Sequence, residues 1–134
     1  MIADTSQTQN IGKILLAEDD DSMRSFLEVV LSRGNYEILP AKDGLEALEI
    51  ALGNEIDAVV TDAVMPNMTG YDLCRILRQT PGKLHIPLII LSGFNEETGA
   101  NEINCPADFY LMKGNNLKED LTKTLDGIFM PKPV

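Results

Sequence analysis

The sequence predicts a three-layer α/β/α domain in which a five-stranded parallel sheet is covered by helices on both faces. Short apolar segments alternate five times with segments whose apolar residues recur at helical spacing. The 134 residues, 44% of them apolar, suffice for one domain with its own core. No internal repeat or low-complexity stretch interrupts the alternation. Alternation of strands and helices in this way is typical of parallel sheets.

The strands are predicted from short apolar runs that end abruptly at polar residues. They are expected over Lys13–Ala17, Tyr36–Ala41, Ile56–Thr61, Pro87–Leu91 and Phe109–Met112. Pro40 indicates an edge position for the second strand, because proline has no N–H to donate to a neighbouring strand.

The helices are predicted from apolar spacing and from residues typical of helix ends. They are expected over Met23–Leu31, Leu45–Leu52, Tyr71–Gln79, Asn95–Asn104 and Asn116–Phe129. Asp43 and Glu46 have the spacing of a capping box. Asn116 and Glu119 repeat this spacing before the last helix. The fourth helix is expected to be weak, because Gly99 lies inside it.

The charge balance and the cysteine content exclude several functions. The 21 acidic residues outnumber 11 basic ones, and a net charge of −10 disfavours nucleic acids and favours cations or basic partner surfaces. Cys74, Cys105 and the single His85 lack the spacing of a zinc site, so the thiols are expected to be inert or buried. With no signal peptide and no apolar run of membrane length, a cytoplasmic location is expected.

The domain boundaries are expected near the two ends of the chain. Residues 1–11 are mostly polar and are predicted to form a flexible leader. Residues 12–129 hold all the predicted elements, and residues 130–134 are interpreted as a tail or linker stub.

Polar side chains follow four of the predicted strands. Glu18–Asp21 follow the first strand, Asp62 the third, Ser92 the fourth and Lys113 the fifth. Because ligands bind at the carboxyl ends of strands in such sheets, these residues are expected to meet at one site. Carboxylates that lie close together repel one another, and a hard cation such as Mg²⁺ relieves that repulsion.

Such a site has the parts that phosphoryl transfer requires. Asp62 is the candidate nucleophile, while Lys113 and Ser92 offer a positive charge and a hydroxyl donor to phosphoryl oxygens. Asp20 or Asp21 is more simply explained as the N-cap of the following helix than as a metal ligand.

Four segments closely resemble the receiver domain of two-component response regulators, in particular the chemotaxis type. They are Lys13–Arg24, Asp57–Gly70, Pro87–Gly93 and Ala107–Lys113, within a resemblance that covers about Gly12–Phe129. The D-x-x-M-P-x-M-x-G pattern of residues 62–70 is its most specific part. The resemblance implies a flavodoxin-like strand order of 2-1-3-4-5 and a role in phosphorelay signal transduction.

The resemblance also implies a role for each residue of the site. Asp62 would take a phosphoryl group from a phosphohistidine of a sensor histidine kinase or a histidine phosphotransfer protein. Glu18 and Asp19 would hold Mg²⁺ together with Asp62 and the backbone carbonyl of Val64. The domain would catalyse only its own phosphoryl transfer and dephosphorylation, and phosphorylation would switch its surface towards an unknown downstream protein.

The later strands would supply the groups that respond to the phosphoryl group. Lys113 would pair with it, Ser92 would reorient to bond it, and Tyr110 would turn inward as an aromatic switch. Gly114 stands where the family usually has proline, so the turn after Lys113 is expected to be looser or differently bent. Thr69 replaces a common aspartate, with little expected effect.

A slow loss of the phosphoryl group is expected. Val64 and Phe94 lie two residues after Asp62 and Ser92, where side chains can flank the attacking water. Both are apolar, so neither can orient that water by a hydrogen bond.

Several alternatives stay open. The chain can be a stand-alone regulator or a receiver cut from a larger regulator or hybrid kinase. A phosphate-independent interaction module of the same fold is a second possibility. An aspartyl-phosphate hydrolase is less favoured, because it leaves Asp62 and the Met65-Pro66 loop unexplained.

Overall fold

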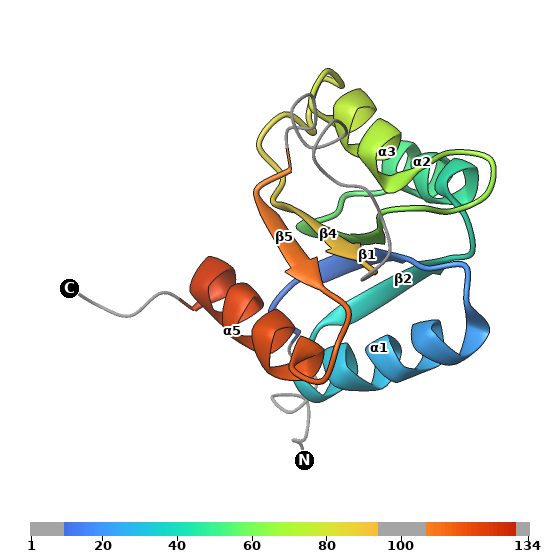
Figure 1. Ribbon diagram of the computed structural model, residues 1–134. Helices are drawn as coiled ribbons and strands as arrows, with labels where there is room; N and C mark the ends of the chain where they lie inside the picture. Colours follow the sequence, from blue (N-terminus) through green and yellow to red (C-terminus); the bar gives the residue numbers. More distant parts are fainter. Residues whose placement is uncertain (1–9, 94–106, 131–134) are drawn as a thin grey trace, which may run out of the picture.

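A computed structural model describes residues 10–93 and 107–130 of the chain and contains the predicted parallel sheet (Figure 1). Its five strands are in the order β2-β1-β3-β4-β5, and all four pairings are parallel. The strands are β1 (Lys13–Ala17), β2 (Glu37–Ala41), β3 (Ala58–Asp62), β4 (Leu88–Ser92) and β5 (Phe109–Met112). The predicted strand order is therefore confirmed, with Pro40 in an edge strand as expected.

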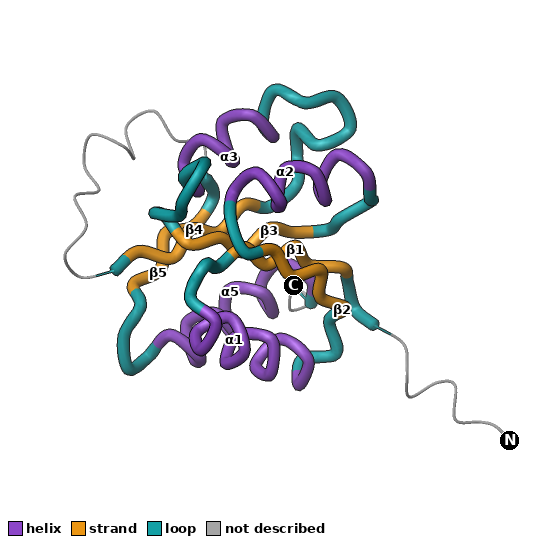
Figure 2. The backbone as a smooth tube through the Cα atoms, turned by 90° about the vertical axis from the view of Figure 1, so that its right-hand side faces the viewer, coloured by secondary structure: helices purple, strands orange, loops and turns teal. Residues whose placement is uncertain are grey.

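Helices cover both faces of the sheet (Figure 2). They are α1 (Asp21–Arg33), α2 (Gly44–Gly53), α3 (Gly70–Leu77) and α5 (Leu117–Phe129). Helices α1 and α5 lie on one face, and α2 and α3 lie on the other. None of these described helices has the length and apolar character needed to cross a membrane.

Each face of the sheet buries its own apolar cluster. Alternate residues of β1 point to opposite faces, so Leu15 belongs to the cluster under α2 and α3 while Ile14 and Leu16 belong to the one under α1 and α5. Cys74 is a buried thiol in the first cluster, as predicted, and Cys105 lies outside the described residues.

The register aligns the carboxyl ends of the strands. Ala17 of β1 pairs with Thr61 of β3, and Asp62 pairs with Leu91 of β4. Ser92 in turn pairs with Met112 of β5. The residues that follow β1, end β3 and β4, and follow β5 therefore share one edge of the sheet.

Side-chain hydrogen bonds cap the starts of three helices, at Asp20 for α1, Asp43 for α2 and Thr69 for α3. Asp20 accepts a hydrogen bond from the Met23 amide at 2.7 Å, which makes it, and not Asp21, the N-cap of α1. Asp43 caps α2 as predicted, by accepting from the Glu46 amide at 2.8 Å.

Some details of the prediction are wrong. Asn116 makes no side-chain cap hydrogen bond, because its backbone (φ −99°, ψ 9°) lacks the extended conformation that points a capping side chain at the helix. Phe26, Leu45 and Leu52 contribute to the apolar spacing that predicts α1 and α2, and the structure leaves all three exposed.

The predicted element bounds differ slightly from those observed. The predicted strands over Tyr36–Ala41 and Ile56–Thr61 begin one and two residues too early, and the helix over Tyr71–Gln79 ends at Leu77. The predicted fourth helix lies outside the described residues, as do residues 1–9 of the leader and most of the tail.

Candidate functional site

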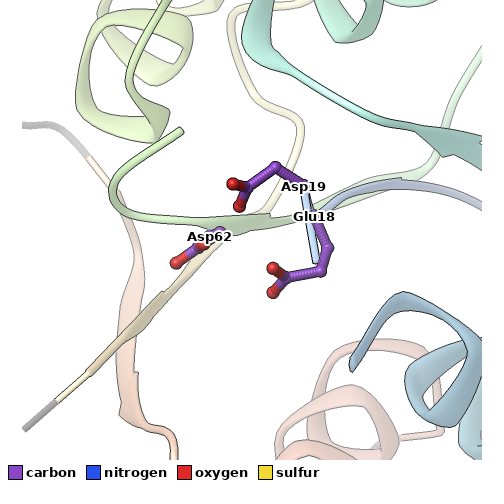
Figure 3. Close-up of side chains that lie close together, drawn as sticks. All are labelled: Glu18, Asp19 and Asp62. Atoms are coloured by element: carbon purple, nitrogen blue, oxygen red, sulfur yellow. The ribbon is translucent and has the colours of Figure 1, made fainter. Parts of the chain in front are cut away.

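Three carboxylates meet at the carboxyl edge of the sheet (Figure 3). Glu18 follows β1, Asp19 is the next residue, and Asp62 ends β3. One carboxylate oxygen from each residue lies within 4.8 Å of those from the other two. Glu18 is 1% exposed and Asp62 is 4% exposed, whereas Asp19 faces solvent. Hard oxygen donors in this arrangement suit Mg²⁺, with open positions on the solvent side.

Lys113 connects the two buried carboxylates. Its ammonium Nζ lies 3.0 Å from Oε1 of Glu18 and 2.9 Å from Oδ1 of Asp62. Burial lowers the pKa of Lys113, but the hydrogen bonds and charges of Asp62 and then Glu18 outweigh burial and raise the pKa above its usual 10.5. The raised pKa keeps the lysine protonated at neutral pH.

Backbone and side-chain contacts hold Glu18 in place. Its N–H donates to the carbonyl oxygen of Ala41 at 3.1 Å. Its Oε2 accepts from the Asp20 amide at 3.1 Å, and its carbonyl oxygen accepts from Nη1 of Arg24 at 3.0 Å. The side chain of Glu18 therefore has one oxygen bound to Lys113 and one bound to the loop that carries Asp19.

The backbone of Asp62 is enclosed by its neighbours. A Cβ atom at Gly70 would lie 2.1 Å from the carbonyl oxygen of Asp62 and 3.0 Å from Oγ1 of Thr61. Thr61 Oγ1 itself donates to that carbonyl oxygen at 3.0 Å, and the Gly70 amide donates to Ala63 at 2.9 Å. Only glycine fits at position 70, which gives the glycine of the D-x-x-M-P-x-M-x-G pattern a steric reason.

The loop between β3 and α3 is tied to the start of α2. Asn67 has a positive φ of 72° and donates to Oδ2 of Asp43 at 3.1 Å. The amide of Glu46 and then the Asn67 side chain stabilise the charged form of Asp43 and lower its pKa. Thr69 accepts from the Asp72 amide at 3.1 Å and caps α3, a role that the sequence analysis missed.

The two residues predicted to respond to a ligand, Ser92 and Tyr110, lie on the adjacent strands β4 and β5. Ser92 is buried at the end of β4, and its Oγ has no hydrogen-bond partner among the described residues. Tyr110 is half-exposed on β5, opposite Ile90. Val64 is half-exposed just after Asp62, and Phe94 lies outside the described residues.

The structure thus brings Glu18, Asp19, Asp62 and Lys113 into one site, with Ser92 at the same edge. Sequence reasoning missed Arg24 and Thr61, which support the site without facing it. Arg24 carries a detectable signal, because it lies four residues after the N-cap Asp20 and a helix brings such a side chain back to its own first turn.

Comparisons with known proteins agree with this geometry. Residues 14–126 match the family model of the response regulator receiver domain. The response regulator MprA of Mycobacterium sp. (strain KMS) is 37% identical over 111 residues, which are 83% of this chain and 48% of that protein. The chain therefore spans about half the length of this curated relative.

Solved structures of similar shape include two further receiver proteins. The receiver domain of the sensor histidine kinase PA1611 from Pseudomonas aeruginosa PAO1, with magnesium in its active-site cleft, is 25% identical and covers 86% of this chain and 94% of its own, with a TM-score of 0.79. The chemotaxis response regulator CheY4 of Vibrio cholerae is 29% identical, with coverages of 87% and 97% and a TM-score of 0.77.

Proposed function

The chain belongs to the receiver-domain family of response regulators, and on that premise we propose that Asp62 is its phosphoacceptor. The supporting observation is that the buried Asp62 carboxylate lies 2.9 Å from the Lys113 ammonium and within 4.8 Å of two further carboxylates. The donor would be a phosphohistidine of a sensor histidine kinase or a histidine phosphotransfer protein. Membership of this family sets the chain apart from classical enzymes.

The residues present fit a magnesium ion. Glu18, Asp19 and Asp62 supply hard oxygen ligands, and the backbone carbonyl of Val64 would add a fourth. When bound, the ion would neutralise negative charge on the carboxylates and on the phosphoryl oxygens. The magnesium in the cleft of the PA1611 receiver domain supports this assignment.

In the transfer step, Asp62 and the phosphorus–nitrogen bond that breaks would be held in line. A carboxylate oxygen of Asp62 forms a bond to phosphorus while the phosphorus–nitrogen bond to histidine breaks, and the bonding pair stays on the imidazole. Lys113 stays protonated and offers its charge to the phosphoryl oxygens, since its raised pKa keeps it cationic.

Two residues would respond to the phosphoryl group on Asp62 and change the surface of the domain. The buried Ser92 hydroxyl, whose Oγ has no described partner, can donate to a phosphoryl oxygen and draw the end of β4 towards Asp62. The half-exposed Tyr110 would then turn inward on β5. The phosphoryl group would bias an equilibrium between two conformations in this way. A downstream protein would read the result.

The phosphoryl group would be lost slowly. The half-exposed Val64 side chain, two residues after Asp62, offers no hydrogen bond to an attacking water. Phe94, the other residue named on this ground, lies outside the described residues.

Beryllofluoride, which imitates a phosphoryl group on a carboxylate, tests the proposal. In amide NMR spectra with Mg²⁺, saturable shifts are expected at the residues that end β3, β4 and β5, including Ser92, and at Tyr110 within β5. They should vanish in Asp62→Asn and without Mg²⁺, and persist in Asp126→Asn, a control in α5. Shifts that survive in Asp62→Asn would contradict the assignment. No shift in the wild type would favour the phosphate-independent interaction module.

A further inference from the structure

Arg24 of α1 is a charged residue whose side chain contacts the backbone next to the proposed magnesium site. Its side chain is only 15% exposed. Nη1 donates to the carbonyl oxygen of Glu18 at 3.0 Å, and Nη2 lies 2.6 Å from Oδ1 of Asp21. Nε lies 4.0 Å from Oε2 of Glu28. One guanidinium therefore joins the first turns of α1 to the end of β1.

The bond to Glu18 is the contact that shapes the site. The Asp21 side chain is 87% exposed and that of Glu28 is 40% exposed, so these ion pairs contribute little stability. They do hold the planar guanidinium in one orientation, which an ammonium could not match. The carbonyl that Nη1 binds belongs to the peptide group joining Glu18 to Asp19. Arg24 thereby fixes the plane of the peptide between two of the carboxylates.

The two cations near the site act differently. Lys113 binds carboxylate oxygens of Glu18 and Asp62 directly, so it shares the atoms that a metal would use. Arg24 binds a backbone oxygen and leaves those atoms available. We propose that Arg24 is a positioning residue of the magnesium site: it orients the Glu18–Asp19 peptide so that the Asp19 carboxylate faces Asp62. This inference rests on the function proposed above.

Charge and positioning make opposite predictions for removal of Arg24. If only its charge mattered, the acidic site would become more negative and bind cations more tightly in Arg24→Met. If it positions Asp19, the same substitution weakens binding. The affinity for Mg²⁺ should fall more than the affinity for Ca²⁺, because Mg²⁺ demands near-ideal octahedral geometry whereas Ca²⁺ tolerates irregular sites.

The experiment titrates MgCl₂ and CaCl₂ into the whole chain and follows backbone amide NMR signals, which also report folding. Loss of a residue that orients a metal ligand typically lowers metal affinity about 10-fold or more. Arg24→Met should therefore bind Mg²⁺ about 10-fold more weakly, and its affinity for Ca²⁺ should fall clearly less. Arg24→Lys keeps the charge but not the planar fork, and it should also bind Mg²⁺ more weakly. Arg75→Met is the matched control. Like Arg24, Arg75 forms an ion pair with an aspartate three residues before it, here Asp72 in α3. Its removal should leave the affinities for Mg²⁺ and Ca²⁺ unchanged.

A second readout needs no metal. The Asp20 amide donates to Oε2 of Glu18 across the same loop, so its hydrogen exchange should be faster in Arg24→Met and unchanged in Arg75→Met. Unchanged or tighter Mg²⁺ binding in Arg24→Met, equal losses for Mg²⁺ and Ca²⁺, or wild-type behaviour of Arg24→Lys would overturn the inference and leave the proposed function standing. A wild-type chain that binds no Mg²⁺ would overturn both.

Discussion

At the scale of single residues, the site is a balance between buried negative charge and one lysine. Glu18 and Asp62 are almost completely buried, and an uncompensated charge in such a place is costly. Lys113 lies 3.0 Å and 2.9 Å from their oxygens and supplies the compensation. The same contacts raise its pKa, so Lys113 stays charged and its charge stabilises the fold at this site.

Replacing this lysine should destabilise the fold in a pH-dependent way. Breaking a buried ion pair costs roughly 3–5 kcal/mol, and solvent screening of the partly exposed Lys113 reduces the expected loss in Lys113→Met to about 1–3 kcal/mol. Because the folded pKa of Lys113 is raised, its contribution is fully present below the unfolded value of 10.5 and is lost as pH rises through the folded pKa.

Urea unfolding of wild type and Lys113→Met in Mg²⁺-free buffer between pH 7 and pH 11 measures this difference. The gap in unfolding free energy should stay constant from neutral pH to about pH 10 and shrink only above the usual lysine pKa. A gap that closes below pH 9 would contradict the raised pKa.

At the scale of elements, helix starts decide how the loops of the site are held. Asp20, Asp43 and Thr69 each cap a helix with a side-chain hydrogen bond, and each has an extended backbone. All three lie beside loops that carry site residues. Asn116 has the right side chain but a backbone at φ −99° and ψ 9°, and it makes no such bond.

A pair of substitutions separates these two kinds of helix start. Thr69→Ala removes the bond to the Asp72 amide and should lower the free energy of unfolding by about 1 kcal/mol. Asn116→Ala removes no cap bond and should cost clearly less. Chemical denaturation of both variants measures the difference. Equal losses of unfolding free energy in the two variants would show that the residue type at the cap, and not the capping hydrogen bond, determines helix stability here.

The elements also show how far the sequence predicts the fold. Apolar runs locate the strands to within two residues, because strands buried on both faces contain few polar residues. Helical spacing locates the helices but not how deeply each apolar residue is buried. Leu45 and Leu52 are exposed because α2 contacts the sheet through small residues such as Ala47 and Ala51. The residue type does not predict the backbone angles at a helix start, as Asn116 shows.

At the scale of the whole molecule, the parallel topology assembles the site. Every strand runs in one direction, so the residues after β1 and β5 meet the ends of β3 and β4 although they are far apart in the chain. Glu18, Asp62 and Lys113 could be predicted because strand ends converge in such sheets. Thr61 could not, because it acts through a backbone carbonyl oxygen that any residue carries. The contact of Arg24 is also with a backbone carbonyl, and its position four residues after Asp20 is the one sequence signal that points to it.

The most direct test of the central claim is the intact mass of the chain after incubation with acetyl phosphate and Mg²⁺. We expect one phosphoryl adduct, stable in acid and labile in base, that is absent without Mg²⁺ and absent in Asp62→Asn. Asp126→Asn should form the adduct like the wild type. An adduct that persists in Asp62→Asn, or a wild type that gains no phosphoryl group while remaining folded, would contradict the account.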